Sequence, residues 1–230
     1  MRFGCVITAA GRGERFGGEI PKTFEPLAGT PMLGHALAAI GRHEAVELVV
    51  VAAPPHLLAD AEAIATAAGL SVPVVVVAGG DTRSASVRAA LAAIPTTVEA
   101  VLVHDAARPF VPSSVITGVV EAVRAGAVAV VPGIEVVDTV KQIDDRGVVV
   151  ATPPRERLRA IQTPQGFRTT LLREALALPD DGATDDAGLV ERLGWPVLVV
   201  PGHADNFKIT HPDDRRRAAE LLRERRDDVH

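Results

Sequence analysis

The sequence predicts an α/β protein with a doubly wound and mostly parallel β-sheet. First, short β-branched apolar runs alternate with amphipathic helical segments between Phe3 and Pro132. Second, these runs are apolar throughout, which is typical of strands buried on both faces of a sheet. Third, the length of 230 residues suits a single domain, residues 1–230, with a sizeable core.

The alternating elements can be placed in order along the first half of the chain. Strands are expected at residues 3–9, 46–52, 72–78, 99–104 and 127–132. Helices are expected between them at residues 32–42, 57–68, 83–94 and 112–125. Because crossovers between parallel strands are right-handed, the loops that follow the strands should gather along one edge of the sheet. Ligands of such sheets bind at that edge.

A β-hairpin is expected to interrupt this alternation after Pro132. Residues 135–143 and 147–153 have β-like sequences, and the DDRG segment between them is typical of a hairpin turn. A projecting two-stranded arm is marginally stable alone and needs a partner surface. The pattern therefore indicates a dimerisation arm at about residues 134–155, with a hairpin lying on its own domain as the alternative.

The remainder of the chain continues with helices and two strands. Helices are expected at residues 169–178, 185–194 and 211–226, and strands at residues 195–202 and 206–210. The basic residues of the last helix are typical of a solvated helix face.

The composition excludes several classes of protein. The net charge of −5 disfavours sequence-independent nucleic-acid binding, which needs a strong positive field. The single cysteine, Cys5, lies in the first apolar run, where a small buried hydrophobe is the expected role. Neither a targeting segment nor an apolar run of about 18 residues occurs, so a soluble cytoplasmic protein is expected.

The loop TAAGRGERFGGEIPK, from Thr8 to Lys22, follows the first strand and nearly fits two glycine fingerprints. In the dinucleotide fingerprint, Phe16 stands where the third glycine is required. In the Walker A motif, Pro21 stands where glycine must precede Lys22, and proline has no N–H to offer a phosphate. Neither an ordinary dinucleotide site nor a P-loop is expected.

The same loop does have the composition of a phosphate site. Small residues that let backbone amides approach an anion are Ala9, Ala10, Gly11 and Gly13. Cations that could clasp phosphate oxygens are Arg12, Arg15 and Lys22. A plain glycine turn with solvated cations is the alternative, and three cations around one turn make it the weaker interpretation.

Two further strand ends carry candidate ligand groups. After the third strand, Gly79 and Gly80 allow close backbone approach, and a helix should begin near Asp81 or Thr82. Arg83 then lies in the first turn of that helix, where a cation opposes the helix dipole, which favours a role in facing a ligand. Ser86 either faces the ligand or packs near the helix start.

The fourth strand ends at Asp105, with Arg108 three residues later. A carboxylate at this position can reach a metal ion or a ribose hydroxyl. Alternatively, Asp105 and Arg108 form a local salt bridge that ties the loop, and both interpretations can hold together.

Seven segments, in order, together resemble the 2-C-methyl-D-erythritol 4-phosphate cytidylyltransferase family of the non-mevalonate isoprenoid pathway. They are AAGRGERFG with PKTF, GGDTRSASV, VHDAARPF, DTVK, TPQGF, GATDDAGLVE and DNFKIT, and they run from Thr8 to Thr210. The resemblance implies a Rossmann-like nucleotidyltransferase and a homodimer with interlocking arms. It also implies a Mg²⁺-dependent transfer of CMP from CTP to methylerythritol phosphate, with release of pyrophosphate.

The resemblance also implies residue roles. Arg15 and Lys22 would stabilise the transition state at the triphosphate, and Arg155 and Lys208 would hold the acceptor phosphate. The cytidine triphosphate pocket would comprise Ala9, Ala10, Gly11, Gly13, Arg15, Lys22, Gly79, Asp81, Arg83, Ser86, Asp105 and Ala106. The acceptor pocket would comprise Asp105, Arg108, Thr139, Arg155, Thr163, Thr184 and Lys208. Asp105 is the candidate metal ligand, with Mg²⁺ held mainly by the CTP phosphates.

Each of the later assignments has a structural alternative. Lys208 could be an exposed strand residue, and Thr184 could be a helix N-cap. Three residues depart from the family pattern: Thr23 stands where Gln is usual, Gly188 where Ser is usual, and Glu14 lies beside Arg15. None of these changes removes a charge that the reaction needs.

Three other functions remain as alternatives. A ribitol 5-phosphate cytidylyltransferase would share the triphosphate half and differ in the acceptor pocket. A non-catalytic nucleotide-binding protein would keep the glycines but would not need both Lys22 and Lys208. A Rossmann oxidoreductase fits less well because of the fingerprint mismatches, and no second domain is expected after His230.

Overall fold

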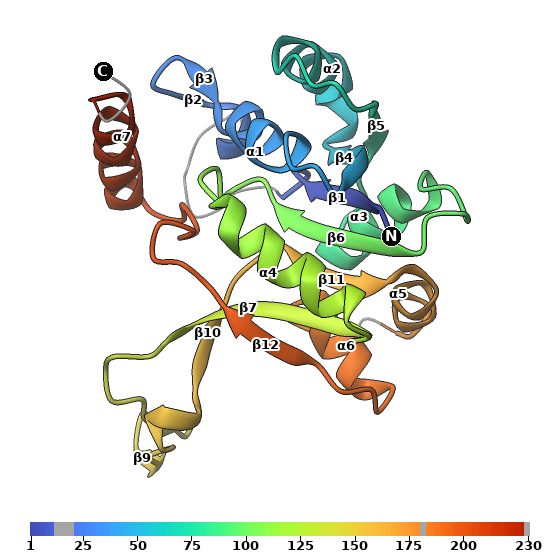
Figure 1. Cartoon of the computed structure of the whole chain (residues 1–230). Coiled ribbons are helices and arrows are strands. Elements are labelled where there is room, and N and C mark those ends of the chain that lie inside the picture. Colours follow the sequence, from blue (N-terminus) through green and yellow to red (C-terminus); the bar gives the residue numbers. More distant parts are fainter. Residues whose placement is uncertain (12–20, 180–182, 228–230) are drawn as a thin grey trace.

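The computed structural model describes residues 1–11, 21–179 and 183–227, and a mixed β-sheet lies at its centre (Figure 1). The strands of the sheet are β1 (Phe3–Thr8), β4 (Val46–Ala53), β5 (Val74–Ala78), β6 (Ala100–Asp105), β7 (Ala129–Glu135), β10 (Arg159–Ile161), β11 (Gln165–Arg168) and β12 (Leu198–Pro201). Their order is β10-β7-β11-β6-β1-β4-β5, and β12 pairs with β7. The expected α/β class is confirmed.

The parallel part of the sheet contains the first four strands expected from the sequence. Strand β1 pairs in parallel with β4 on one side and with β6 on the other, and β4 pairs in parallel with β5. The strand order therefore reverses direction at β1. In doubly wound sheets, such a switch point opens a crevice beyond the carboxyl ends of the neighbouring strands.

The other half of the sheet differs from the sequence-based expectation. Strand β11 lies between β6 and β7 and pairs antiparallel with both, and β10 pairs antiparallel with β7. Both strands were missed because they are short and polar at several positions, so no apolar run marks them. The expected strand at residues 206–210 is wrong: this segment has no strand pairing, and Ile209 N donates instead to Ala107 O at 2.9 Å.

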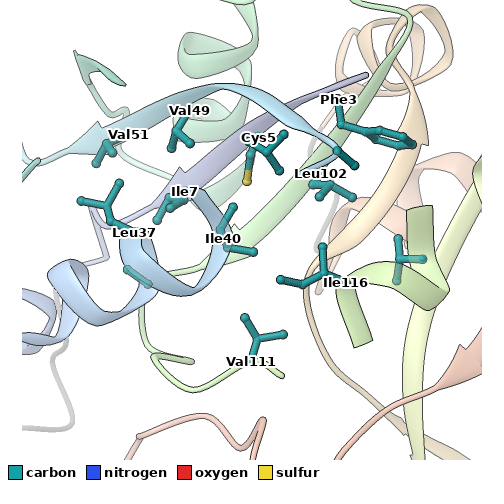
Figure 2. Packing of buried hydrophobic residues seen from close by; sticks show 14 of the residues in the cluster. Phe3, Cys5, Ile7, Leu37, Ile40, Val49, Val51, Leu102, Val111 and Ile116 are labelled. Carbon is teal, nitrogen blue, oxygen red and sulfur yellow. The ribbon is translucent and has the colours of Figure 1, made fainter. Parts of the chain in front are cut away.

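Helices cover both faces of the sheet. One face is covered by α1 (Met32–Gly41), α2 (Leu58–Ala67) and α4 (Ser113–Arg124), and the other by α3 (Arg83–Ala92), α5 (Thr169–Leu176) and α6 (Asp186–Arg192). Strand β1 serves both layers, because Phe3, Cys5 and Ile7 pack into the first (Figure 2) and Val6 packs into the second. The burial of Cys5 is confirmed, and that burial raises the pKa of its thiol.

The expected arm is present but has less strand than its sequence predicts. Strands β8 (Gln142–Ile143) and β9 (Val149–Ala151) form a separate antiparallel pair. The Asp144 carboxylate accepts from the Val148 amide at 2.8 Å and closes the turn between them. Figure 1 shows this hairpin extending away from the body of the domain, at the lower left.

The C-terminal helix packs near the segment that follows Lys22. Helix α7 (Pro212–Asp227) contacts the small hairpin of β2 (Pro26–Leu27) and β3 (Thr30–Pro31), which follows the short helix η2 (Lys22–Phe24). A third apolar cluster joins them through Leu27, Met32, Phe110, Ile209 and Ala218. Two further short helices are η3 (Pro55–Leu57) and η4 (Arg155–Arg157). Within the described residues, no helix has the length and apolar character needed to cross a membrane.

Gly166, where β11 packs against α4, and Gly118, at an open position of α4, together give a test of the packing. A Cβ on Gly166 would lie 2.6 Å from Val119 Cγ1, so Gly166→Ala should destabilise the fold by about 1–3 kcal/mol. A Cβ on Gly118, within α4, would meet nothing within 4 Å, so Gly118→Ala should stabilise the fold by roughly 0.5–1 kcal/mol. Urea denaturation of both variants measures the two changes, and a stable Gly166→Ala protein would contradict this account of the interface.

Candidate active site

A cavity of about 690 Å³ lies at the carboxyl ends of β1, β4, β5 and β6. Its position is the one expected from the switch point at β1. Its lining includes the following residues selected from the sequence: Ala10, Gly11, Lys22, Gly79, Asp81, Arg83, Ser86, Asp105 and Lys208. Four separate segments of the chain, distant in sequence, therefore converge on one pocket.

Gly79, just after β5, lies against Ala10, two residues after the end of β1. A Cβ at Gly79 would lie 2.4 Å from Ala10 Cβ and 2.9 Å from Ser86 Oγ, so no larger residue fits there. Ser86 Oγ accepts from the Gly80 amide at 3.1 Å and holds this turn to α3. The expected helix start is confirmed, because Thr82 caps α3 by accepting from the Ala85 amide at 3.0 Å.

Asp105 is the centre of the charged groups in the cavity. Its carboxylate accepts from Lys208 Nζ at 2.9 Å and from Arg83 Nε at 3.3 Å. Thr8 Oγ1 donates to the same carboxylate at 3.3 Å. Burial alone would raise the pKa of Asp105, but Arg83 and Lys208 outweigh it and hold this pKa well below its usual range. Asp105 is therefore ionised at neutral pH.

Arg83 is shared between two carboxylates. Besides Asp105, its Nη1 pairs at 2.7 Å with Asp186, which is fully buried at the start of α6. Burial alone would lower the pKa of Arg83, whereas Asp186 and Asp105 raise it above its ordinary value. The unfavourable position of this cation in the first turn of α3 is offset by two anions.

The alternative of a local salt bridge between Asp105 and Arg108 is wrong. Asp105 pairs instead with the more distant residues Arg83 and Lys208. Arg108 Nη1 donates to Asn206 O at 2.7 Å, and Nη2 donates to Ile161 O at 3.4 Å. Arg108 thus ties its loop to two other segments through their backbones.

A second cavity of about 220 Å³ adjoins the same charged groups. It is lined by Arg83, Asp105, Arg108, Ile161, Gln162, Thr163, Gln165, Thr184, Asp185 and Lys208. Arg83, Asp105 and Lys208 also line the larger cavity. The two cavities therefore meet at one carboxylate held between two cations.

A buried histidine supports the wall between these cavities. His104 Nε2 lies 3.0 Å from Arg108 O, which can only accept, so this nitrogen carries the proton. Its Nδ1 then accepts from Thr163 Oγ1 at 2.9 Å, and the same hydroxyl accepts from the Asp105 amide at 3.1 Å. Burial lowers the pKa of His104 from 6.5 to about 4, so the ring is neutral at pH 7.

The structure places the remaining selected residues outside the two cavities or outside the described residues. Gly13 and Arg15, together with Arg12 and Glu14, are not among the described residues. Ala9 and Ala106 are buried behind the larger cavity, where Ala9 O accepts from Thr23 Oγ1 and the Ala106 amide donates to Thr8 O. Thr139 and Arg155 lie exposed on the arm, and Arg155 donates to Val137 O at 2.7 Å.

The structural alternatives given above for Thr184 and Lys208 are also wrong. The N-cap of α6 is Asp185, whose carboxylate accepts from the Gly188 amide at 2.9 Å, and it is not Thr184. Lys208 is not a strand residue, and its side chain is 42% exposed beside Asp105.

Several lining residues were missed by sequence reasoning. In the larger cavity they are Thr8, Pro54, Pro55, His56, Thr82, Ala107 and Thr210. Pro54, Pro55 and His56 follow the carboxyl end of β4, and that position alone could have selected them. In the second cavity, Gln162 precedes Thr163 and Gln165 begins β11, and only Thr163 had been selected from the TPQGF segment.

No resident metal centre is formed by the described residues. Within residues 1–11, 21–179 and 183–227, no three His, Cys, Asp or Glu side chains gather where they could hold a metal ion. Of the two carboxylates selected from the sequence that line the larger cavity, Asp81 and Asp105, Asp105 also lines the second cavity. A metal here would need most of its ligands from a bound substrate.

A doubly wound sheet with this arrangement defines a class of protein. Glycine turns and cations surround the larger cavity, and a second polar cavity opens onto the same cations, as expected for an enzyme that joins a nucleotide to another anion. The fold and site are those of a nucleotidyltransferase.

Comparison with known proteins gives the family. The family model for 2-C-methyl-D-erythritol 4-phosphate cytidylyltransferase matches residues 4–224, and the chain belongs to this family. A relative of that name from Streptomyces coelicolor is 50% identical, covering 98% of this chain and 86% of the relative. Another from Streptomyces avermitilis is 49% identical, covering 98% of this chain and 93% of the relative.

Solved structures agree with the family. The cytidylyltransferase of the same name from Thermus thermophilus has a TM-score of 0.75 and 39% identity, covering 97% of this chain and 100% of that chain. The 4-diphosphocytidyl-2C-methyl-D-erythritol synthase of Anaerococcus prevotii has a TM-score of 0.84 and 29% identity, covering 96% of this chain and 99% of that chain. The chain is thus a cytidylyltransferase that forms 4-diphosphocytidyl-2-C-methyl-D-erythritol from CTP and 2-C-methyl-D-erythritol 4-phosphate.

The buried His104 predicts a pH dependence of stability. Its pKa is lower in the folded protein than in the unfolded chain, so the unfolded chain binds more protons as pH falls below 6.5. The contribution of His104 to the free energy of unfolding is therefore complete above that pH and is lost progressively towards pH 4.

Urea denaturation of the wild-type protein and of His104→Gln at about pH 7 and about pH 5 measures this loss. We expect the wild-type protein to lose more stability than the variant between the two conditions. His43, whose pKa burial also lowers, is present in both proteins and cancels from the comparison. An equal loss in both proteins would contradict the assignment.

Proposed function

We propose that CTP occupies the larger cavity and methylerythritol phosphate the smaller one, so that the reacting groups meet between Arg83, Asp105 and Lys208. The observation that carries this division is that these three residues line both cavities. A volume of about 690 Å³ is in the range of a pocket for a nucleotide-sized ligand. The smaller cavity, of about 220 Å³, suits a short polyol phosphate.

The chemistry needs positioning and charge stabilisation more than proton transfer. An oxygen of the acceptor phosphate is already anionic at neutral pH, and it attacks the α-phosphorus of CTP. A new P–O bond forms while the bond to the pyrophosphate oxygen breaks, and the electron pair leaves with pyrophosphate. Repulsion between the anions is the main obstacle, and cations fixed around them lower the barrier.

Each cation has a proposed place in this reaction. Lys22 neutralises the triphosphate from one side of the larger cavity, together with Arg15 of the glycine loop. Lys208 lies between the two cavities and draws the acceptor phosphate towards the α-phosphorus. Asp105 keeps Arg83 and Lys208 in position, because its carboxylate pairs with both.

The remaining residues form the walls of the two pockets. In the nucleotide pocket, Ala10, Gly11 and Gly79 offer backbone groups that a base and phosphates can approach closely. In the acceptor pocket, Arg108, Thr163 and Thr184 offer hydrogen-bonding groups to the hydroxyls and the phosphate.

We propose Mg²⁺ as the cofactor, bound mainly through phosphate oxygens of CTP. A single carboxylate of the pocket, Asp105, fits this binding mode, because protein-bound Mg²⁺ commonly takes one or two carboxylates and completes its shell with substrate oxygens and water. The bound ion would screen the charge of the triphosphate. Arg83, Lys22 and Lys208 would carry the rest of that task.

We propose further that the arm at about residues 134–155 belongs to a dimer and completes the acceptor pocket of the partner. Thr139 and Arg155 lie on the arm and line neither cavity of their own chain. The arm also exposes large apolar side chains, with Val137 79% and Ile143 58% accessible. Such a surface favours a protein contact.

The direct test is pyrophosphate release by the purified protein. Each of the four ribonucleoside triphosphates is paired with methylerythritol 4-phosphate or with ribitol 5-phosphate, in Mg²⁺ and then in EDTA. We expect release with CTP, methylerythritol phosphate and metal together. Release with ribitol phosphate instead would overturn the proposed acceptor pocket, and release in EDTA would overturn the metal requirement.

Substitution of Lys22 tests its place at the triphosphate. We expect Lys22→Ala to lower kcat by about a hundredfold, the scale of losing one group that stabilises transition-state charge, while the fold is retained. Arg42→Ala, at an exposed position just after α1, is the matched control and should keep wild-type turnover. Wild-type turnover of a folded Lys22→Ala protein would remove Lys22 from the mechanism.

A mixing experiment tests whether the acceptor pocket is shared. Lys22→Ala and Arg155→Ala are each expected to be nearly inactive as homodimers. In a mixed dimer, one pocket combines an intact Lys22 with an intact Arg155 from the other subunit. Random pairing should then restore roughly a quarter of wild-type activity. Absence of restored activity, with mixed dimers shown by mass spectrometry, would mean that the arm does not act across an interface.

A further inference from the structure

The two lysines of the proposed mechanism are connected through one segment, residues 206–210, called here the strap. Lys208 lies within the strap and pairs with Asp105. Lys22 Nζ donates to Ile209 O, in the same strap, at 2.6 Å. The lysine of the nucleotide pocket is thus bonded to the residue next to the lysine that lies between the pockets.

The start of the strap is fixed to the acceptor side of the site. Asn206 is fully buried, and its Nδ2 donates to Gln162 Oε1 at 3.2 Å and to Thr163 O at 2.8 Å. Ile209 N donates to Ala107 O at 2.9 Å, which fixes the middle of the strap beside the end of β6.

The end of the strap is fixed to the nucleotide side by helix α7. The Asp214 carboxylate accepts from the Thr210 amide at 2.7 Å and from the His211 amide at 2.8 Å, so the strap runs rigidly into the helix. From the first turn of α7, Arg215 then reaches back to the Lys22 segment. It pairs with the Glu25 carboxylate and donates to Pro26 O at 2.7 Å.

Glu25 is the residue immediately after η2, the short helix that begins at Lys22. Its amide donates to Lys22 O at 3.1 Å, and its carbonyl accepts from the Met32 amide at 3.2 Å. A displacement of the Glu25 side chain would therefore also move the backbone of Lys22, which lies within one turn of it. Figure 1 shows α7 at the upper left, on the same side of the molecule as the β2–β3 hairpin.

We propose that the Glu25–Arg215 ion pair is a positioning clasp that holds Lys22 and Lys208 in register across the two substrate pockets. The inference rests on the proposed roles of those lysines. Each side chain of the pair is partly buried, at 32% and 21% exposure for Arg215 and Glu25, so the pair is better shielded than a surface pair. Glu25 and Arg215 touch neither cavity, so they would act only through the lysines.

The chain offers a matched control on the same helix. Arg216, the residue after Arg215, pairs with Asp213. Both side chains are largely exposed, at 77% for Arg216 and 81% for Asp213. Arg216→Met removes an ion pair of the same chemistry that connects α7 only to itself. Any effect of charge loss on helix α7 as such should appear equally in this variant.

The test measures kcat and melting temperature for Glu25→Gln, Arg215→Met, the double variant and Arg216→Met. We expect each clasp variant to lower kcat roughly tenfold, because small displacements of catalytic groups have effects of this size or larger. The double variant should be no worse than either single variant, since the two residues act as one unit. The melting temperature should change little, and Arg216→Met should behave as wild type.

A second comparison separates positioning from a general structural role. If the clasp acts through Lys22, Arg215→Met should cause little further loss in the Lys22→Ala background. An additional tenfold loss in that background, an unchanged kcat in Arg215→Met, or an equal loss in Arg216→Met would each overturn the clasp. Wild-type turnover in Lys22→Ala alone would overturn the proposed role of Lys22. This failure is distinguishable from failure of the clasp, because Glu25 and Arg215 are unchanged in that variant.

Discussion

The arrangement of this site depends on one carboxylate, Asp105, held between Arg83 and Lys208. Two cations brought this close would repel each other without an anion between them, and neither would stay where both cavities can use it. The position of Asp105 comes from the sheet, since β6 pairs in register with β1 and brings Asp105 opposite Thr8. The Thr163 hydroxyl, held by His104, then fixes the backbone of Asp105 by accepting from its amide. Because these hydrogen bonds and ion pairs fix the polar cluster, it can keep two substrates aligned without rearranging in each catalytic cycle.

The charge of the whole chain and the charge of the site have opposite signs. The ion pairs of the site explain how an acidic chain can present a cationic cavity. The chain carries a net charge of −5, yet the cavity walls present Lys22, Arg83 and Lys208. Arg83 is matched by the buried Asp186 as well as by Asp105, so its charge is neutralised from behind. In the proposed arrangement an anionic substrate would meet cations that are fixed in place, while the chain as a whole keeps an acidic balance that disfavours nucleic acids.

The larger cavity could be predicted from the sequence, and the smaller one could be predicted only as residue types. Glycine turns and cations after apolar strands are local signals, so Gly79, Arg83 and Asp105 were found with their correct strand ends. The partners of Asp105 were not, because the pairing with Lys208 spans 103 residues and no local pattern encodes it. Strands β10 and β11 were not predicted for a similar reason. They are defined by pairing with β7 and β6, and their own sequences are short and polar. The residues of the glycine loop that carry Arg15 are outside the described part of the chain, and their role stays a prediction.

The order of these elements along the chain has a consequence for biosynthesis. The strands that bear the larger cavity, β1, β4, β5 and β6, are complete by residue 105, and they pair only with one another up to that point. Strand β11 must later enter between β6 and β7, and the strap with Lys208 follows still later. During translation, the ribosome therefore releases a sheet with an open edge at β6 well before the strand that covers it. The nascent chain completes the strands around the larger cavity first and the strap with Lys208 last, so a chain stalled before β11 is a candidate for chaperone capture or for premature pairing with another copy.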